Sequence, residues 1–399
     1  MAFENVSKYK EQIYRCNTCG RCPRGPWDPN QPTVLPLPER QCPIYETHKM
    51  LSYSAQGMIL IIRDLLEGKI QPYESLISAV YECLLCQHCN AVCAATNAIP
   101  LGELECAQIF QALRADLVDM GVAPPASMKN VNNKIQDKHN RMGNDRPRGA
   151  WAEGMNIPAK GATMIFAGCT AAYQNKEVVQ SLAKIMQEAG MDFGMLEDEW
   201  CCGALQYDSG LLHDFRASVQ HNVDAIRNTG AKEIVMVCAD GYKTIKNDYP
   251  KYAGNLGFDV IHSSELIARL LNNNQISFTK KIDLGGMATY FDPCLLARAN
   301  NVIDQPRNII NAIPGIRHVE MEGFGKYTNC CGRPIVNPVS KETYLRAGRD
   351  RIKDALAVEA RAIITGCVNC KQSMTVAATK LGAEIKVMDI AELVTQAIA

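Results

Sequence analysis

The sequence of 399 residues lacks a charge imbalance, a long apolar run and an apolar leader. Lys and Arg together number 42, as do Asp and Glu, which argues against a nucleic-acid surface or a polybasic membrane anchor. The most apolar run, 58–62, ends at Arg63 and Asp64, far short of the roughly 20 residues that span a bilayer. Residues 1–10 are polar and do not resemble a secretory signal. We therefore expect a cytoplasmic chain that reaches a membrane only through a partner protein.

Nucleotide-binding motifs are also absent. The sequence contains neither the G-x-G-x-x-G fingerprint of dinucleotide-binding folds nor the G-x-x-x-x-G-K phosphate loop. We therefore expect no flavin or nicotinamide on this chain, so that any such cofactor belongs to a partner.

Cysteine, by contrast, is abundant, with 18 residues. Disulfide frameworks are typical of small secreted domains, which this chain does not resemble. One run reads Cys16-x-x-Cys19-x-x-Cys22, followed later by Cys42, and a second reads Cys83-x-x-Cys86-x-x-Cys89-x-x-x-Cys93. Zinc sites use pairs of C-x-x-C, whereas triplets with a distant fourth cysteine are typical of [4Fe–4S] clusters. The two runs therefore predict two cubane clusters.

In two-cluster ferredoxin arrangements, the fourth cysteine of each run ligates the other cluster. The ligands predicted for the first cubane are thus Cys16, Cys19, Cys22 and Cys93, and those predicted for the second cubane are Cys83, Cys86, Cys89 and Cys42. Two features depart from the usual pattern. A long Pro-rich insertion separates Cys22 from Cys42, and Ala94 stands where a proline usually follows the last cysteine.

The sequence around these runs has helical periodicity, with apolar residues three and four apart over 54–67 and 105–120. Residues 1–150 are therefore predicted to form a helical domain that holds both clusters. Cys106 belongs to no motif and is predicted to be a buried small apolar residue. The Pro- and Gly-containing stretch 122–160 is predicted to be a long linker that wraps over its neighbour.

The remainder of the chain is an internal duplication. Three landmarks recur at offsets of 125, 129 and 129 residues: a cysteine after an apolar run (Cys169 and Cys294), a Cys-Cys-Gly turn (from Cys201 and Cys330), and a second strand-end cysteine (Cys238 and Cys367). We call residues 151–285 the first copy and residues 286–399 the second copy.

Each copy alternates β-rich runs with helical stretches, which predicts parallel α/β units. The expected strands are 162–167, 233–237 and 259–262 in the first copy and 288–291, 362–365 and 384–388 in the second; the expected helices are 176–189, 211–228, 344–357 and 390–398. Asp389 and Glu392 have the spacing of a capping box. Because ligands bind at the carboxyl ends of parallel strands, we expect the strand-end cysteines to meet the Cys-Cys-Gly turns there.

This order of motifs resembles the cysteine-rich CCG-domain family, and the whole arrangement is similar to the HdrD-type catalytic component of heterodisulfide reductase. It is also similar to the iron–sulfur subunits of glycolate oxidase and anaerobic glycerol-3-phosphate dehydrogenase, and to the HdrD-like component of class II benzoyl-CoA reductase. The resemblance implies a helical two-cluster ferredoxin domain followed by two Rossmann-like α/β CCG domains, an α+β multidomain protein.

The resemblance also implies a noncubane [4Fe–4S] cluster on five cysteines in a complete CCG domain. The second copy has all five, which are catalytic if the site itself is redox-catalytic: Cys294, Cys330, Cys331, Cys367 and Cys370. The first copy retains Cys169, Cys201, Cys202 and Cys238, but Gly241 stands at the fifth position. The sequence leaves three alternatives for the first copy, which are a zinc ion, a different cluster and no metal.

The leading interpretation is an electron-transfer subunit of a multi-subunit anaerobic oxidoreductase. It would relay electrons between two cubanes and the noncubane cluster, with a flavin- or iron–sulfur-containing partner as donor or acceptor and with no nucleic acid bound. One alternative is a catalytic thiol–disulfide reductase that acts on a heterodisulfide. A second alternative is a structural scaffold in which these cysteines bind zinc.

Overall fold

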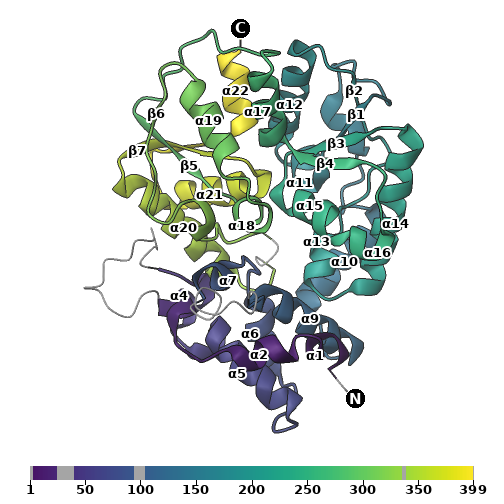
Figure 1. Ribbon diagram of the computed structural model, residues 1–399, viewed down its shortest axis with the longest axis vertical. Coiled ribbons are helices and arrows are strands. Elements are labelled where there is room, and N and C mark those ends of the chain that lie inside the picture. The colour runs from purple at the N-terminus through teal and green to yellow at the C-terminus, as the bar shows by residue number, and fades with distance from the viewer. Residues whose placement is uncertain (1–2, 25–39, 94–103, 335–337, 399) are drawn as a thin grey trace.

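The computed structural model describes residues 3–24, 40–93, 104–334 and 338–398 (Figure 1). A helical N-terminal part lies below two α/β units that stand side by side, the first copy in teal and green and the second in green and yellow (Figure 1). Most of the Pro-rich insertion after Cys22, and Ala94, lie outside the described residues.

The N-terminal part is built from short helices around two longer ones. Its elements are α1 (Glu4–Ser7), α2 (Lys10–Arg15), α3 (Arg21–Arg24), α4 (Pro43–His48), η1 (Leu51–Tyr53), α5 (Ala55–Leu66), α6 (Glu74–Glu82), α7 (His88–Val92) and α9 (Cys106–Asp119). The helices α5 and α9 confirm the periodicity over 54–67 and 105–120. They contact each other, and Ile59, Ile62 and Leu113 are fully buried between the helices of this part.

The stretch 122–160 is more structured than a linker. It contains the 13-residue helix α10 (Ala126–Lys138) and the 3₁₀ turn η2 (Arg148–Ala152). Asn132 of α10 donates to Asp214 at 2.7 Å and accepts from Gln206 at 3.1 Å, and Trp151 of η2 is buried in the core of the first copy. The expected wrapping over a neighbour is therefore observed, but as a packed helix and turn, because polar pairs and Trp151 fix the segment to the first copy.

The first copy contains a four-stranded parallel sheet in the order β2-β1-β3-β4. Its strands are β1 (Thr163–Phe166), β2 (Phe193–Met195), β3 (Glu233–Met236) and β4 (Asp259–His262). Its helices are α11 (Gly168–Tyr173), α12 (Lys176–Glu188), α13 (Ala204–Asp208), α14 (Leu212–Thr229), α15 (Ala239–Lys243), the π-helical turn η3 (Thr244–Asp248), α16 (Pro250–Ala253) and α17 (Ser263–Asn272).

The second copy repeats this plan with the strand order β6-β5-β7-β8, also fully parallel. Its strands are β5 (Met287–Phe291), β6 (Arg317–His318), β7 (Ala360–Thr365) and β8 (Lys386–Asp389). Its helices are α18 (Cys294–Asn300), α19 (Asp304–Ala312), η4 (Gly325–Tyr327), α20 (Lys341–Ala357), α21 (Val368–Leu381) and α22 (Ile390–Ala397). The identical strand order agrees with the duplication inferred from the sequence.

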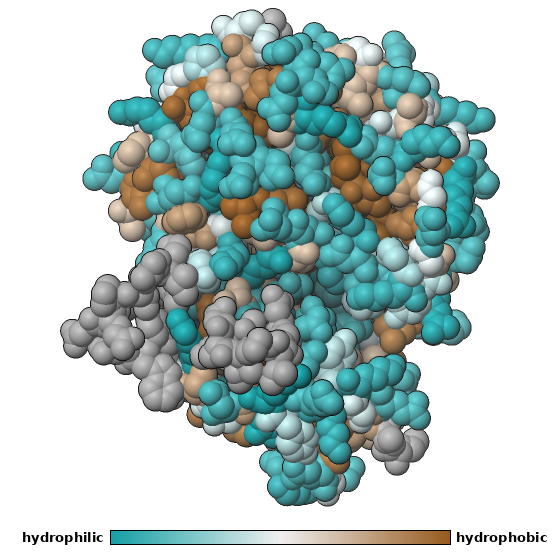
Figure 2. All heavy atoms as spheres, in the orientation of Figure 1, coloured by the Kyte–Doolittle hydropathy of each residue, from teal (hydrophilic) through white to brown (hydrophobic). Residues whose placement is uncertain are grey.

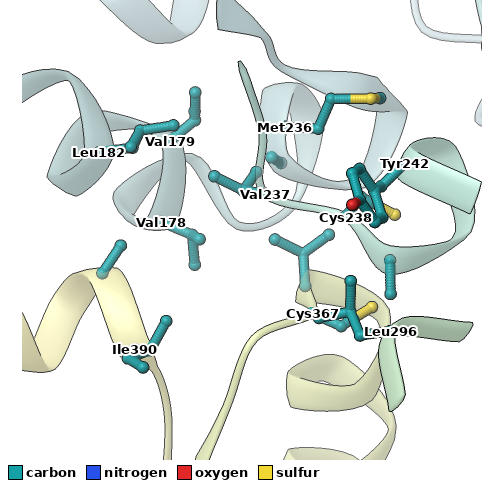
Figure 3. Close-up of a cluster of buried hydrophobic side chains, with 14 of the residues drawn as sticks. Val178, Val179, Leu182, Met236, Val237, Cys238, Tyr242, Leu296, Cys367 and Ile390 are labelled. Atoms are coloured by element: carbon teal, nitrogen blue, oxygen red, sulfur yellow. The ribbon is translucent and has the colours of Figure 1, made fainter. Parts of the chain in front are cut away.

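The two copies pack through matching helices, α12 against α22 and α17 against α19. Their buried apolar side chains form one continuous core, part of which is seen in Figure 3, where Val178 of α12 lies on the side of Ile390 of α22. Such packing fixes the facing edges of the two copies relative to each other. Within the described residues, no helix combines the length and apolar character needed to cross a membrane.

Candidate metal centres

The eight cysteines of the N-terminal runs line two small cavities. One cavity is lined by Cys16, Cys19, Cys22 and Cys93, together with Cys89 and Cys106. The other is lined by Cys42, Cys83, Cys86 and Cys89, together with Cys22. The last cysteine of each run therefore lies with the triplet of the other run, which is the crossing that the sequence predicts.

Burial and mutual proximity keep the thiols of Cys22, Cys42 and Cys83 from ionising without a metal. Burial is the main cause that raises the pKa of Cys83 to about 12 and those of Cys22 and Cys42 well above the ordinary value. Neighbouring cysteines raise these pKa values further. Buried, clustered thiols are costly to ionise on their own. Bound iron removes this cost, because its positive charge compensates the negative charges of the thiolates. Cys106 is buried as expected, yet it hydrogen-bonds to Cys89 at the edge of the first cavity.

The five cysteines of the second copy converge. Cys294 begins α18, Cys367 precedes α21 and Cys370 lies in its first turn, while Cys330 and Cys331 form the turn before Gly332. The Sγ atoms of Cys331 and Cys370 lie 3.3 Å apart, Cys330 hydrogen-bonds to Cys294 and Cys331, and Cys367 to Cys370. All five are at most 4% exposed, so the thiolates of a bound cluster would be shielded from solvent.

Gly332 is required at this turn. Its φ of +101° is rarely adopted by other residues, and a Cβ atom there would lie 2.5 Å from the carbonyl oxygen of Tyr344. The backbone of the Cys-Cys-Gly turn therefore packs directly on α20.

A sulfur contact joins the N-terminal part to the second copy. Cys86, from the second run, hydrogen-bonds to Cys330 across the boundary. This bond, followed by the nearby charge of Arg298, lowers the pKa of Cys86 to about 6 although burial opposes the change. A cluster held by Cys86 and one held by Cys330 would therefore have adjacent ligand atoms.

The two copies also meet at cysteines. The Sγ atoms of Cys238 and Cys367 and a carboxylate oxygen of Asp240 lie within 4.8 Å of one another. Figure 3 shows that Cys238 of the first copy and Cys367 of the second copy lie near each other. Asn369 links the same group, since its Nδ2 donates to Asp240 at 3.0 Å. Cys238 thus lies close to the second copy as well as to its own.

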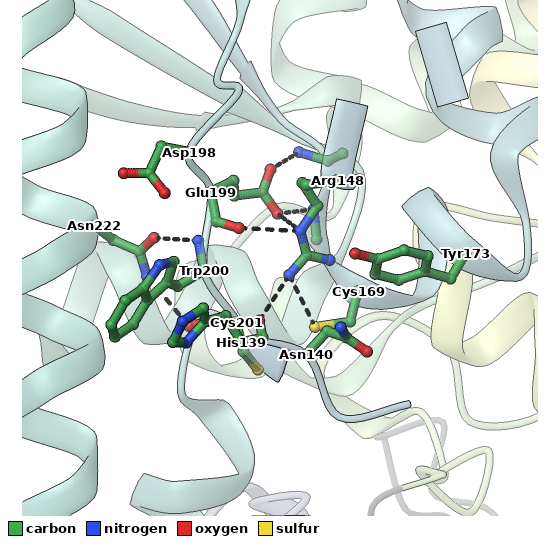
Figure 4. A network of polar contacts seen from close by, with 12 residues as sticks. His139, Asn140, Arg148, Cys169, Tyr173, Asp198, Glu199, Trp200, Cys201 and Asn222 are labelled. Carbon is green, nitrogen blue, oxygen red and sulfur yellow. Dashed lines mark hydrogen bonds and ion pairs between the residues drawn. The ribbon is translucent and has the colours of Figure 1, made fainter. Parts of the chain in front are cut away.

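The first copy has a buried ion pair where cysteines gather (Figure 4). Arg148 lies 3.6 Å from the Sγ of Cys169 and forms an ion pair with Glu199, whose carboxylate accepts from the amides of Ala167 at 2.7 Å and Gly168 at 2.9 Å. Although burial opposes it, the charges of Cys169 and Glu199 raise the pKa of Arg148. Burial raises the pKa of Glu199 to about 7.

Two further cysteines of the first copy, Cys201 and Cys202, follow Cys169 in a series of contacts. Cys201 hydrogen-bonds to both Cys169 and Cys202, and a Cβ atom built on Gly241 would lie 3.6 Å from the Sγ of Cys202. Gly241 therefore occupies the place of a fifth ligand without supplying one. Arg148 and Glu199 belong to no sequence motif. Only the tertiary structure shows that they form an ion pair beside Cys169.

A cleft of about 330 Å³ opens where the three parts meet. Its charged lining consists of Lys243, Lys251, Arg298, Lys326, Arg333, Asp208 and Asp248, and no cysteine is among the described residues that line it. The face seen in Figure 2 is mainly hydrophilic between the two copies and the helical part. The cleft therefore leads from the solvent to the second run, at Leu85 and Gln87, but none of the cysteines of that run lines it.

Family comparisons agree with this division. Residues 12–97 match the 4Fe-4S dicluster domain, and residues 163–246 and 288–375 each match the cysteine-rich CCG domain. The fold and the cysteines thus define an iron–sulfur protein with one dicluster domain and two CCG domains.

The HdrD component of the dihydromethanophenazine:CoB–CoM heterodisulfide reductase of Methanosarcina barkeri is 32% identical over 327 residues, 80% of this chain and 78% of that protein. Its counterpart in Methanosarcina mazei is 29% identical over 403 residues, 97% of this chain and 94% of that protein. The chain belongs to this HdrD family of heterodisulfide reductase components. A hypothetical protein from Helicobacter pylori has a similar fold, with a TM-score of 0.55 at 9% identity, covering 86% of this chain and 67% of that one.

Proposed function

We propose that this chain is the iron–sulfur electron-transfer subunit of a multi-subunit cytoplasmic oxidoreductase. In this role it relays electrons between two cubane [4Fe–4S] clusters and a noncubane cluster of the second copy. The observation that carries the proposal is the continuous series of sulfur contacts from Cys86 to Cys330, and on through Cys331 to Cys370.

The two cavities and the contacts among the cysteines of the second copy support the proposed ligands. The first cubane takes Cys16, Cys19, Cys22 and Cys93, the second cubane takes Cys83, Cys86, Cys89 and Cys42, and the noncubane cluster takes Cys294, Cys330, Cys331, Cys367 and Cys370. The parallel sheet of each copy, with its first strand inside the sheet, supports a Rossmann-like fold for both CCG domains. The proposed domains are 1–150, 151–285 and 286–399.

For the first copy, the local charges favour a structural role over a second noncubane cluster. Gly241 supplies no fifth thiolate, and the buried guanidinium of Arg148 already offers Cys169 a positive neighbour. A zinc ion on Cys169, Cys201, Cys202 and Cys238 remains compatible with the donor set, since four thiolates suit zinc.

The electron donor or acceptor is proposed to be a flavin- or iron–sulfur-containing partner subunit. The chain carries no dinucleotide-binding fingerprint, so the proposal assigns any two-electron cofactor to that partner. Membrane attachment, if the complex has it, would then also come from a partner.

A second candidate function is a catalytic heterodisulfide reductase, as in the relatives of that name. The approach of Cys238 to Cys367 favours it, because the two copies would face a disulfide substrate together. It requires substrate access to the second copy, whose cysteines are buried.

Anaerobic purification of the full chain with its co-purifying partners tests the proposed function. We expect about eight irons per chain from the two cubanes and about twelve when the second copy is filled. Cys16→Ser should remove one cubane signal from the electron paramagnetic resonance spectrum and leave the other.

Two other outcomes would replace the relay by another function, and a third would refute its ligand assignment. About four zincs with little iron would support the zinc scaffold. Rapid oxidation of the reduced protein by a disulfide would support the catalytic reductase. Survival of both cubane signals in Cys16→Ser would refute the ligand assignment.

A further inference from the structure

Three arginine side chains, two from helices and one from a loop, bind the backbone of the second run. Arg114 of α9 donates to the carbonyl oxygen of Cys83 at 2.7 Å. Arg333, after the Cys-Cys-Gly turn, donates to that of Leu84 at 2.8 Å, and Arg298 of α18 to that of Cys86 at 2.7 Å. Two of these three cations come from the second copy, and they meet the segment that holds three proposed ligands of the second cubane.

One of the three has a counterpart at the first cubane. Arg63 of α5 donates to the carbonyl oxygens of Ile13 and Cys16 at 2.8 and 2.6 Å. Arg114 makes the same pair of bonds to Val80 and Cys83, at 2.6 and 2.7 Å. In each case the two carbonyls belong to the first cysteine of the triplet and to the residue three before it. The two cubane sites are therefore matched in this cation.

The other two arginines differ in how their charge is balanced. Arg333 is 3% exposed and pairs with both Asp208 and Asp240, so carboxylates offset its charge. Among the described residues Arg298 has no carboxylate partner, and its hydrogen bonds go to the carbonyl oxygens of Cys86, Lys326 and Thr328. Arg298 is thus a cation at the second cubane, besides Arg114, that no carboxylate among the described residues offsets.

Arg298 also occupies the boundary through which the Cys86–Cys330 contact passes. Its Nε binds the carbonyl of Cys86, and its Nη1 binds that of Thr328, two residues before Cys330. One rigid guanidinium therefore fixes the two backbones that carry the neighbouring sulfur atoms.

A carboxylate of opposite effect adjoins the second run. Glu82, 4% exposed and adjacent to Cys83, accepts from Thr343 and lies 2.8 Å from Nε2 of His48. Its carboxylate disfavours added electrons at the second cubane. The effect of Arg298 is therefore isolated by comparing variants in which Glu82 is unchanged.

Reduction adds one electron, and thus one negative charge, to a buried cluster. A nearby uncompensated cation stabilises that charge, and poor screening in the interior strengthens the effect. We propose that Arg298 is a positioning residue that raises the reduction potential of the second cubane and holds Cys86 beside Cys330. The inference rests on the proposed function, since it concerns the clusters assigned above.

The test is a redox titration of the full chain, prepared anaerobically, reduced with dithionite and followed by electron paramagnetic resonance. In Arg298→Gln we expect the midpoint potential of one cubane to become more negative, while the other cubane and the iron content are unchanged. Arg63→Gln is the control at the first cubane, and it should shift the potential of that cubane alone. Arg298→Lys keeps the charge and should leave the potential close to the wild-type value.

Failure of this inference is distinguishable from failure of the proposed function. An iron-free wild-type chain would refute the proposed function. A fully loaded Arg298→Gln chain with unchanged potentials, or with equal shifts in both cubanes, would refute the role of Arg298 alone. If Arg298→Gln loses the second cubane, Arg298→Lys decides: a near wild-type potential supports the charge effect, and a potential well below it overturns the proposal.

Discussion

The two copies share one backbone plan but differ in what surrounds their cysteines. In the second copy five cysteines converge, and Cys330 contacts Cys86 of the N-terminal part. In the first copy four cysteines remain, Gly241 stands at the fifth position, and Arg148 lies 3.6 Å from Cys169. The difference teaches that the α/β scaffold is maintained independently of the cluster site, because strand order depends on core packing and not on the thiols.

A smaller difference concerns the last strand of each copy. His262, the last residue of β4, and Asp389, the last residue of β8, both cap the following helix, each within a capping box that a glutamate completes. The hydrogen-bond pattern is the same in both copies, but only one of the two caps is a histidine that can lose its acceptor by protonation. The copies should therefore respond differently to pH.

The largest expected difference between the copies is in metal content. Cys330→Ser should remove the noncubane cluster, because it takes away a ligand from the centre of the five, and should lower iron from about twelve to about eight per chain. Cys201→Ser, at the matching position of the first copy, should leave iron unchanged. Equal iron losses in the two variants would show that both copies hold clusters.

The next largest effect is expected at the ion pair of the first copy. Arg148→Met leaves Glu199 buried without its partner, so the free energy of unfolding should fall by about 3–5 kcal/mol in denaturant titrations. The double variant with Glu199→Leu removes both charges and should recover much of the loss. A single variant as stable as the wild type would mean that Arg148 is not the partner on which Glu199 depends.

The cap of the first copy should give a pH dependence of its own through His262. Burial lowers the pKa of His262 to about 4 from 6.5, so the folded state resists protonation. Its contribution to stability is therefore complete above about pH 6.5 and is lost progressively as pH falls toward 4, up to about 3 kcal/mol. His262→Asn should keep the cap and abolish this part of the pH dependence. The prediction is wrong if the stability–pH curves of both proteins coincide.

Much of the fold could be predicted because its signals are local. The strand β4 and the helices α5, α9, α12 and α22 agree with the apolar periodicity to within one residue at each end. The capping box of Asp389 and Glu392 is confirmed as well. The strands β2 and β6 were not predicted, because edge strands of three and two residues are too short for a pattern.

The candidate site, like the fold, could be predicted from the sequence only in part. The spacing of the cysteines determined which residues could hold clusters, because one cube needs three thiolates from one short stretch and a fourth from elsewhere. Only the tertiary structure decided which cations accompany them, since Arg298 and Cys86 are 212 residues apart in the sequence. The spacing of cysteines in the sequence indicates which thiols of one segment can bind the same cluster. The charged residues around a buried site, in contrast, come from elements that are distant in the sequence and that the fold packs against it.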